Sequence, residues 1–304
     1  MSPLNGGFEY RERLGPAAAG LALLDYLSER YRHSTREEWR ARIRAGRVLI
    51  QGKPVALQVV LSPGQLLTWR RPPWQEQEVP LQFAILYIDD HLLAVAKPSG
   101  LPTVPGGDFL ENTLLWRIKQ RFPEADPLHR LGRGTSGLVL FARTGAARRN
   151  LSADWREGRV VKIYRALVSG FPEHDEFTVD VPIGPVRHEV LGAVYAASPR
   201  GKAARSRVRV LERRAADSLV EIAIETGRPH QIRIHMAAAG HPLTGDLLYS
   251  GGGIPIDGTR ALPGDGGYLL HSARLEFAHP AGGQKIEINC PPPPLLRMGQ
   301  YRGR

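Results

Sequence analysis

The chain has 304 residues, of which 42% are hydrophobic, 41 are Lys or Arg and 30 are Asp or Glu, so its formal net charge is +11. This apolar content excludes a wholly disordered chain, and the single Cys290 excludes an intramolecular disulfide and a cysteine-rich zinc site. No apolar run reaches the roughly 20 residues of a membrane span, and the charged N-terminus is not typical of a signal peptide. We therefore expect a cytoplasmic protein of about two domains with no membrane partner.

The basic residues are 35 Arg and only 6 Lys. Arg binds phosphate through a planar fork and stacks on bases, so this excess favours a nucleic-acid partner. The alternative is a coding sequence rich in G and C, because Ala, Gly and Pro are abundant as well.

The N-terminal part of the chain predicts two short helices and a small sheet. Residues 1–16 are expected to form an irregular leader, and helical spacing then relates Leu21, Leu24, Leu27 and Tyr31. The run Ser34-Thr35-Arg36-Glu37 is typical of a capping box that begins a second helix, which ends near Gly46. Short strands are predicted at 48–50, 55–57 and 66–69.

The second predicted helix carries a row of cations. Arg36, Arg40 and Arg44 are four residues apart and so share one helix face, and Arg47 and Lys53 follow. Such a row suits the phosphates of RNA or DNA. The alternative is an ordinary solvated face, although those usually mix charges of both signs.

The stretch from Ser34 to Val55 resembles the S-four-like RNA-binding domain, to which we assign residues 17–72. That family binds structured RNA with a helix pair and the hairpin that follows. The resemblance implies that RNA contacts Arg36, Arg40, Arg44, Arg47 and Lys53.

Residues 73–82 are expected to form a proline-stiffened linker, residues 83–290 a larger domain and residues 291–304 a loose basic tail. In the larger domain, helices are predicted at 114–122, 146–155 and 229–239, and strands at 85–88, 92–96, 138–142, 164–168, 177–181, 208–211 and 219–224. Because the strands come in hairpins and alternate with helices only in places, we predict an α+β fold with a mixed, mainly antiparallel sheet.

Four segments of this domain carry the polar residues of a candidate site: 94–100, 129–137, 162–166 and 227–246. The loop 129–137 contains three glycines, two arginines and two hydroxyl side chains, a composition that suits phosphate and sugar oxygens. It lacks the lysine and the spacing of a Walker loop.

Taken in this order, the four segments resemble the RluA family of RNA pseudouridine synthases over about residues 80–290. The resemblance implies an isomerase that breaks the bond between C1′ and N1 of a uridine in RNA and rejoins the base through C5. It implies no cofactor and no metal, and ribosomal or transfer RNA as the partner of a protein that need not be more than a monomer. The target uridine has to leave its stack first.

The resemblance also implies roles for individual residues of the pocket. Arg130 matches the arginine that enters the vacated space, Tyr164 the tyrosine that stacks on the flipped uracil, and Ile232 lies in the motif that lines the base pocket. Arg228 matches the basic residue that pairs with the catalytic carboxylate. Thr135 and Ser136 belong to the same pocket.

The catalytic carboxylate itself is absent from its expected position. The family pattern is His-Arg-Leu-Asp, whereas this chain has His129-Arg130-Leu131-Gly132, so the catalytic residue is unassigned. Another acid such as Asp126 or Asp246, a water or an anion could replace it, or the pocket no longer isomerises. The first hypothesis is therefore an RNA pseudouridine synthase, and the alternative is an impaired or inactive synthase scaffold that acts as an RNA-binding or RNA-folding factor.

Other polar residues are expected to have structural roles. We interpret His129, His241 and His271 as hydrogen-bonded structural groups, and Lys97 as part of a turn against the sheet. His230 and His235 are five residues apart, which places them poorly for a shared metal on a helix. The alternating Arg205, Arg207 and Arg209 either extend the RNA surface or form a solvated strand face.

Overall fold

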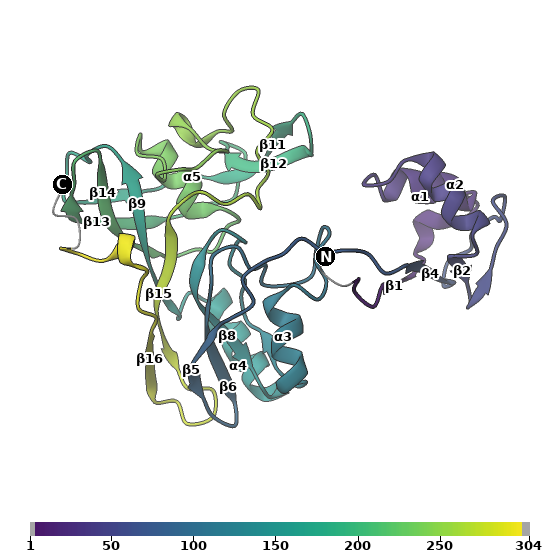
Figure 1. The fold of residues 1–304 in the computed structure, drawn as a ribbon, viewed down its shortest axis with the longest axis horizontal. Coiled ribbons are helices and arrows are strands. Elements are labelled where there is room, and N and C mark those ends of the chain that lie inside the picture. Colours follow the sequence, from purple (N-terminus) through teal and green to yellow (C-terminus); the bar gives the residue numbers. More distant parts are fainter. Residues whose placement is uncertain (1–3, 300–304) are drawn as a thin grey trace. The chain divides into compact units, whose positions relative to one another are not determined.

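The computed structural model describes residues 4–299, which form two compact units (Figure 1). One unit ends at Glu76 and the other begins at Gln77, inside the segment 73–82 that was expected to be a linker. The first three residues of the expected leader and the last five of the expected tail lie outside the described range. Within residues 4–299, no helix has both the length and the apolar character needed to cross a membrane.

The N-terminal unit packs two helices on a four-stranded sheet whose strand order is β1-β4-β2-β3. Its elements are β1 (Phe8–Arg13), α1 (Leu23–Arg30), α2 (Arg36–Arg44), β2 (Val48–Ile50), β3 (Lys53–Pro54) and β4 (Leu66–Arg71). The capping box of α2 lies one residue later than predicted, because Thr35 and Glu38 exchange the two hydrogen bonds. The second hairpin strand lies at β3 instead of 55–57, since the turn at Gln51 and Gly52 starts the return pairing at once.

The expected irregular leader is partly wrong. Residues 8–13 form β1, which pairs antiparallel with β4 from Phe8 and Arg71 to Arg13 and Leu66. The strand escaped prediction because four of its six residues are charged, and β1 lies at an edge of the sheet where such residues are tolerated.

The larger unit is built on a ten-stranded sheet, which confirms the predicted α+β class. Its elements are β5 (Ala84–Ile88), β6 (Leu92–Lys97), α3 (Leu114–Arg121), β7 (Asp126–Pro127), β8 (Ser136–Ala142), α4 (Gly145–Arg156), β9 (Val161–Ser169), β10 (Glu176–Val179), β11 (Ile183–His188), β12 (Gly192–Ala197), β13 (Ser206–Arg213), β14 (Asp217–Ile224), α5 (Gln231–Ala238), β15 (Leu270–Ala278) and β16 (Lys285–Asn289). The order is β10-β13-β14-β9-β15-β8-β6-β5, with β16 on β15 and β7 on β8. Within this sheet only β15 and β8 pair in parallel.

Strand β15 brings the distant motifs of the candidate site together at the centre of the sheet. His271 pairs with Ser136 of β8, and Ser272 pairs with Tyr164 of β9. Gly137 makes the parallel pairing possible, since it has φ +111° and a Cβ there would lie 2.3 Å from the Ser272 carbonyl oxygen. The motifs at 129–137 and 162–166 are therefore neighbours, although strand β15 was not predicted.

Two further differences concern the start of helix α5 and the segment near the C-terminus. Helix α5 begins at Gln231 and not at Pro229, because His230 has the left-handed values φ 55° and ψ 21°. The first part of the expected loose tail packs on the domain: Leu296 is 1% exposed, and Arg214 donates to the Leu295 carbonyl oxygen at 2.8 Å. Buried apolar contact holds this segment, which its proline-rich and basic sequence did not indicate.

His129 provides a test of the core around β8. Leu140 N–H donates to its Nε2 at 3.1 Å and its ring stacks on Trp155, while burial, with a smaller effect from Lys162, lowers its pKa to about 3. Because the unfolded chain binds this proton at much higher pH, we expect the free energy of unfolding to fall as pH decreases from about 6.5, by up to roughly 1.4 kcal/mol per pH unit from this group. Urea unfolding at several pH values measures this slope.

The matched control is His129→Gln, which keeps an acceptor for Leu140 but does not titrate in this range. The variant should have a flatter stability profile between pH 6.5 and pH 4 than the wild type. Parallel profiles for the two proteins would contradict the buried neutral histidine.

Candidate active site

Side chains of the motif at 94–100 donate hydrogen bonds to carbonyl oxygens of the loop 129–137. The Lys97 ammonium, 2% exposed, donates to the carbonyl oxygens of Leu101 at 2.7 Å and of Arg133 at 3.3 Å. Ser99 Oγ donates to the Gly134 carbonyl oxygen at 2.7 Å. Burial lowers the pKa of Lys97 to about 7. Lys97 therefore supports the turn, in line with the structural interpretation of this motif.

The principal charged feature of the site is a buried ion pair between α5 and the following loop. Arg233 Nε lies 2.7 Å from Asp246 Oδ2, and Nη2 lies 2.8 Å from Oδ1, with side-chain exposures of 3% and 0%. Asp246 also accepts the Leu248 N–H at 2.9 Å. Burial lowers the pKa of Arg233, but the hydrogen bond to Asp246 together with the charges of Tyr268, Asp246 and Tyr249 raises it overall. The two parallel hydrogen bonds fix the guanidinium and the carboxylate against each other.

Tyr268 joins this ion pair to the loop that contains Gly132. The Arg233 guanidinium lies over the Tyr268 ring, 4.2 Å from its centroid. The Tyr268 hydroxyl is 3.3 Å from Thr135 Oγ1, and a Cβ at Gly132 would lie 3.2 Å from the same hydroxyl. Gly132 itself is exposed, so a side chain at residue 132 would have solvent on one side and the Tyr268 phenol on the other.

Tyr164 and Ile232 lie in the same core cluster as Leu131 and Tyr268, which places the predicted base-pocket residues together. They are 8% and 5% exposed. Burial raises the pKa of Tyr164 to about 12, so the phenol stays protonated at neutral pH. Of this cluster, the Tyr268 ring lies directly against the Arg233 guanidinium.

The predicted role of Arg228 requires correction. Its Nε donates to the Ala203 carbonyl oxygen at 3.0 Å, and its backbone N–H donates to Gln231 Oε1 at 3.1 Å. Arg228 precedes α5 in the connection from β14, whereas Arg233 lies inside the helix and is buried. The guanidinium that pairs with a carboxylate is therefore that of Arg233. Its apolar sequence neighbours, Ile232 and Ile234, could have indicated that this position is buried.

The candidate replacement acids lie in different places. Asp126 is on the surface, where it pairs with Lys119 at 3.0 Å and with Arg148 at 2.9 Å. Asp246 is the carboxylate that neutralises the buried arginine. Sequence spacing alone could not reveal this pairing, because Asp246 lies beyond the end of α5 and only the turn after the helix brings it back to Arg233.

Arg130 and His230 lie near each other at the edge of the pocket. Arg130 is exposed, and its charge adds to burial and to the charge of Arg233 in lowering the pKa of His230 to about 4. The neutral His230 Nδ1 is 2.6 Å from the Tyr249 hydroxyl. An exposed arginine beside a buried neutral ring is free to extend toward a ligand.

Ser136 does not join the group around Tyr164. Its hydroxyl is 2.9 Å from His271 Nδ1, and both residues line a cavity of about 690 Å³ together with Lys97, Tyr268 and Pro292. The His271 Nε2 is 3.0 Å from the Cys290 carbonyl oxygen, so His271 is a hydrogen-bonded structural residue as predicted.

The arginine row of the N-terminal unit is partly neutralised. Arg36 pairs with Asp25 at 2.5 Å, and Arg40 pairs with Glu37 at 2.6 Å. The remaining members of the predicted set are exposed: Arg44, Arg47 and Lys53. The phosphate-binding capacity of this face therefore rests more on its C-terminal end than the spacing indicated.

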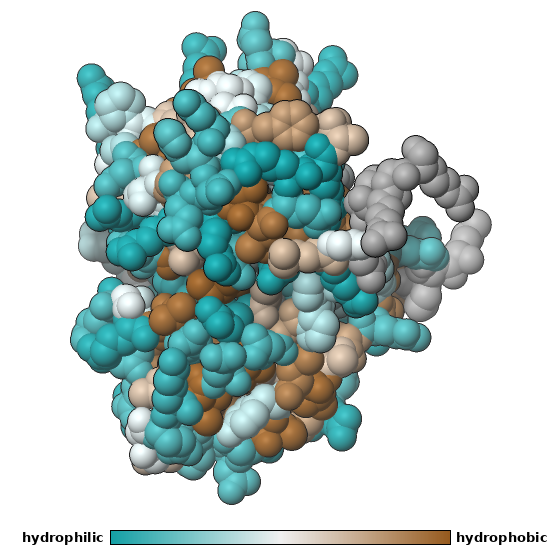
Figure 2. All heavy atoms as spheres, turned by 90° about the vertical axis from the view of Figure 1, so that its left-hand side faces the viewer, coloured by the Kyte–Doolittle hydropathy of each residue, from teal (hydrophilic) through white to brown (hydrophobic). Residues whose placement is uncertain are grey.

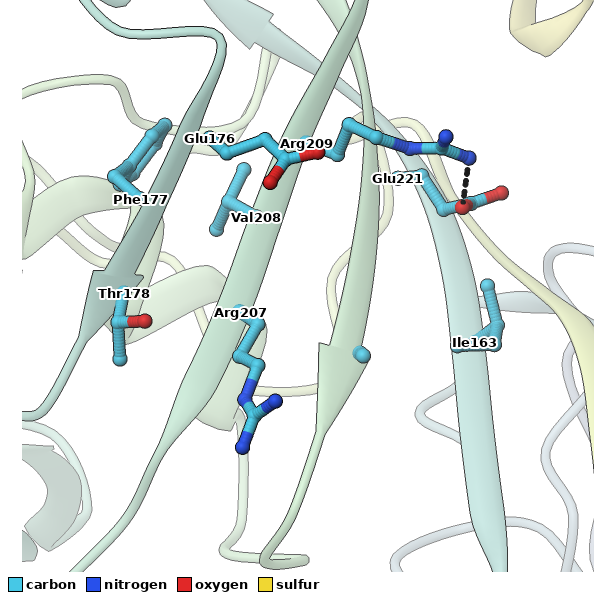
Figure 3. Close-up of a pocket in the computed structure, with 9 residues that line it drawn as sticks. Ile163, Glu176, Phe177, Thr178, Arg207, Val208, Arg209 and Glu221 are labelled. Carbon is cyan, nitrogen blue, oxygen red and sulfur yellow. Dashed lines mark hydrogen bonds and ion pairs between the residues drawn. The ribbon is translucent and has the colours of Figure 1, made fainter.

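A second cavity, of about 320 Å³, lies on β10, β13, β14 and β9 (Figure 3). Arg209 pairs across it with Glu221 at 2.7 Å, and Arg207 pairs with Glu225 at 2.8 Å. On the face shown in Figure 2, hydrophobic residues form several patches among hydrophilic ones. The ion pairs favour the interpretation of these arginines as a solvated strand face.

Comparison with known proteins identifies the family. The profile described as RNA pseudouridylate synthase matches residues 91–238. An uncharacterized RNA pseudouridine synthase of Synechocystis is 47% identical over 276 residues, covering 90% of this chain and 95% of the relative. RNA pseudouridine synthase 5 of Arabidopsis thaliana is 37% identical (97% and 95% covered), and ribosomal large subunit pseudouridine synthase C of Vibrio cholerae is 34% identical (82% of each).

A solved structure agrees with these relatives. Human RNA pseudouridylate synthase domain containing 1 superposes with a TM-score of 0.58 and 27% identity, covering 73% of this chain and 89% of the human one. The chain belongs to the RluA-type RNA pseudouridine synthases, which are isomerases. The names of these relatives are those of synthases, so they lend no support to the alternative of an inactive scaffold.

The buried ion pair makes a stability prediction. Asp246→Asn leaves the Arg233 charge without a partner in a buried position, so we expect the free energy of unfolding to fall by about 3–5 kcal/mol. Denaturant unfolding measures this loss. The control is Asp265→Asn, because Asp265 is 39% exposed and lies 3.5 Å from Arg133, and its loss should cost about 1 kcal/mol or less. Equal effects of the two substitutions would contradict the importance of the buried pair.

Proposed function

We propose that this chain isomerises a uridine of ribosomal RNA in the pocket formed by Tyr164, Ile232, Arg233 and Tyr268. The observation that carries the proposal is the intact surrounding of Gly132: an apolar cluster, a buried guanidinium and a phenol meet beside an open position. Ribosomal RNA is favoured over transfer RNA because relatives from Vibrio cholerae and Nitrosomonas europaea are named as large-subunit synthases.

The pocket suits a base that has left its stack. Tyr164 and Ile232 offer a flat ring and an aliphatic side chain to the two faces of a uracil. Arg130, exposed at the edge, supplies a planar cation that can fill the space left in the RNA. Unstacking costs a few kcal/mol, and these contacts offset that cost.

Asp246 and Tyr268 supply two polar groups around residue 132, one that balances the charge of Arg233 and one that lies beside the open position. Both oxygens of Asp246 are engaged by Arg233 and the side chain is 0% exposed, so we assign it to positioning the guanidinium. The Tyr268 hydroxyl lies 3.2 Å from the Cβ position of residue 132, where a carboxylate would begin. We assign this hydroxyl to the polar contact with the sugar of the flipped uridine.

The N-terminal unit would hold the RNA while the pocket acts on it. Its helix pair and hairpin correspond to the S-four-like resemblance, and Arg44, Arg47 and Lys53 are exposed for phosphate contacts. Single-chain action as a monomer, without metal or organic cofactor, is part of the same proposal.

Pseudouridine mapping tests the isomerase. Purified wild-type chain should convert a uridine of large-subunit ribosomal RNA, and Tyr268→Phe should lower the rate by about 100-fold, as expected for loss of a positioned polar group. Tyr195→Phe is the control, because this tyrosine is 44% exposed and lies on β12. The double variant Gly132→Asp with Tyr268→Phe should recover activity, since the change to Phe removes the hydroxyl that would crowd the new side chain.

Several results would overturn parts of this proposal. If wild-type protein binds the RNA but converts no uridine, the isomerase assignment is wrong. If ribosomal RNA is unmodified and transfer RNA is modified, the choice of substrate is wrong. Unchanged activity of Tyr268→Phe would remove Tyr268 from the reaction.

Salt titration tests the arginine row. Arg44→Glu with Arg47→Glu, which changes two exposed arginines at the C-terminal end of the row, should weaken RNA binding and reduce the dependence of affinity on salt, because phosphate contacts release counterions. The control is Arg207→Glu with Arg209→Glu, a similar charge change on the strand face whose arginines are already paired. Binding that is equally affected in both double variants would reflect net charge alone.

A further inference from the structure

Four aromatic rings form a continuous series in the N-terminal unit, which we call the aromatic row: Phe8, Tyr10, Trp69 and Trp39. Phe8 meets Tyr10 edge to face at 4.8 Å between centroids, and Tyr10 stacks on Trp69 at 4.9 Å and 15°. Trp69 meets Trp39 at 5.1 Å and 73°. The row therefore runs from the sheet strands β1 and β4 to helix α2.

One end of the aromatic row is buried and the other is exposed. Trp39 is 1% exposed, whereas Tyr10 is 41% and Phe8 is 43% exposed. Along the same face of β1, Glu12 accepts hydrogen bonds from Tyr26 and Arg30 of α1, so that helix covers only this end of the strand. The rings of Phe8 and Tyr10 lie beyond this end and are partly open to solvent.

Cations are interleaved with the rings. The Arg42 guanidinium lies 4.6 Å from the Trp39 centroid and 4.7 Å from the Trp69 centroid. Burial lowers the pKa of His33, and the charges of Arg42 and Arg71 lower it further. These two arginines therefore lie close enough to add positive charge around His33. Arg71, which pairs with Phe8 in the sheet, also stacks on Trp74 at 3.6 Å.

Aromatic faces bordered by arginines are the arrangement that binds single-stranded nucleic acid. Bases stack on such rings whatever their identity, and the cations attract the backbone. Protein interfaces are also rich in aromatic residues and arginine, but they bury about 800 Å² on each partner, whereas the exposed end of the aromatic row consists of two rings, Phe8 and Tyr10. The chemistry of this surface therefore favours unpaired RNA.

We propose that the exposed end of the aromatic row, Phe8 and Tyr10 backed by Trp69, stacks on unpaired bases of the RNA that this chain modifies. The site is separate from the arginine face of α2 and recognises a different feature, the faces of bases that are out of a helix. The identification of RNA as the ligand of this site rests on the proposed function. Stacking on these rings favours binding of RNA loops or single strands over binding of continuous duplex.

Binding measurements with the full chain test this site. The double variant Phe8→Leu with Tyr10→Leu keeps apolar side chains against Trp69 but removes both aromatic faces. We expect its affinity for a short unstructured RNA to fall by about tenfold or more, and its affinity for a blunt RNA duplex to change by less than about twofold. The salt dependence should be unchanged, because no phosphate contact is lost.

Two matched variants separate stacking from general effects. Phe171→Leu changes a phenylalanine that is 50% exposed in the other unit, and it should bind both RNAs like the wild type. Tyr10→Phe keeps the ring and should also bind normally. Unfolding curves of all variants establish that the loss is not caused by misfolding.

The outcomes distinguish this site from the proposed function. Wild-type protein that binds neither RNA would contradict the proposed function itself. Wild-type protein and the double Leu variant that bind unstructured RNA equally would overturn the aromatic site alone. If the wild type self-associates in sedimentation and the double Leu variant does not, the rings serve a contact between copies and the RNA assignment is wrong.

Discussion

The buried pair of Arg233 and Asp246 is the interaction on which the site of this protein depends. A guanidinium inside a domain is tolerated only when a carboxylate and further acceptors surround it. Here Asp246 supplies two hydrogen bonds and the Pro263 carbonyl oxygen a third at 2.9 Å, so α5 and the loop after it are locked together. The rings of Tyr249 and Tyr268 then lie against the cation, which fixes the aromatic side of the pocket.

This arrangement explains how the pocket around Gly132 keeps its charge balance. With Asp246 already in place, the arginine does not require a side chain at residue 132 for charge balance. Gly132 can then be exposed without leaving an unpaired buried charge. The polar groups beside this position are the Tyr268 phenol and the Thr135 hydroxyl.

Much of the architecture could be predicted from local patterns, and the failures have physical causes. Helices α1 to α4 followed from apolar spacing and caps, and the antiparallel character followed from hairpins. The missed strands are β1, β7, β11, β12, β15 and β16. For β1 the reason is that an edge strand tolerates charge, and for β15 that a central strand is defined by partners far away in the chain. The same limit applied to the site: Tyr164 and Ile232 were predicted by resemblance, whereas the pairing of Arg233 and the position of Tyr268 depend on contacts between distant segments.

The parallel pairing of β8 with β15 has a consequence for how the molecule acquires its site. Gly137 and Ser272, which are 135 positions apart in the sequence, must meet before the loop 129–137 has a neighbour on that side. Such non-local contacts slow folding, since loop-closure entropy is lost before they form. During synthesis, the segments up to β14 emerge while the middle of the sheet still lacks β15. The candidate site is therefore among the last parts of the chain to become ordered, and a shortened product that ends before residue 270 would contain most of the motifs but no assembled site.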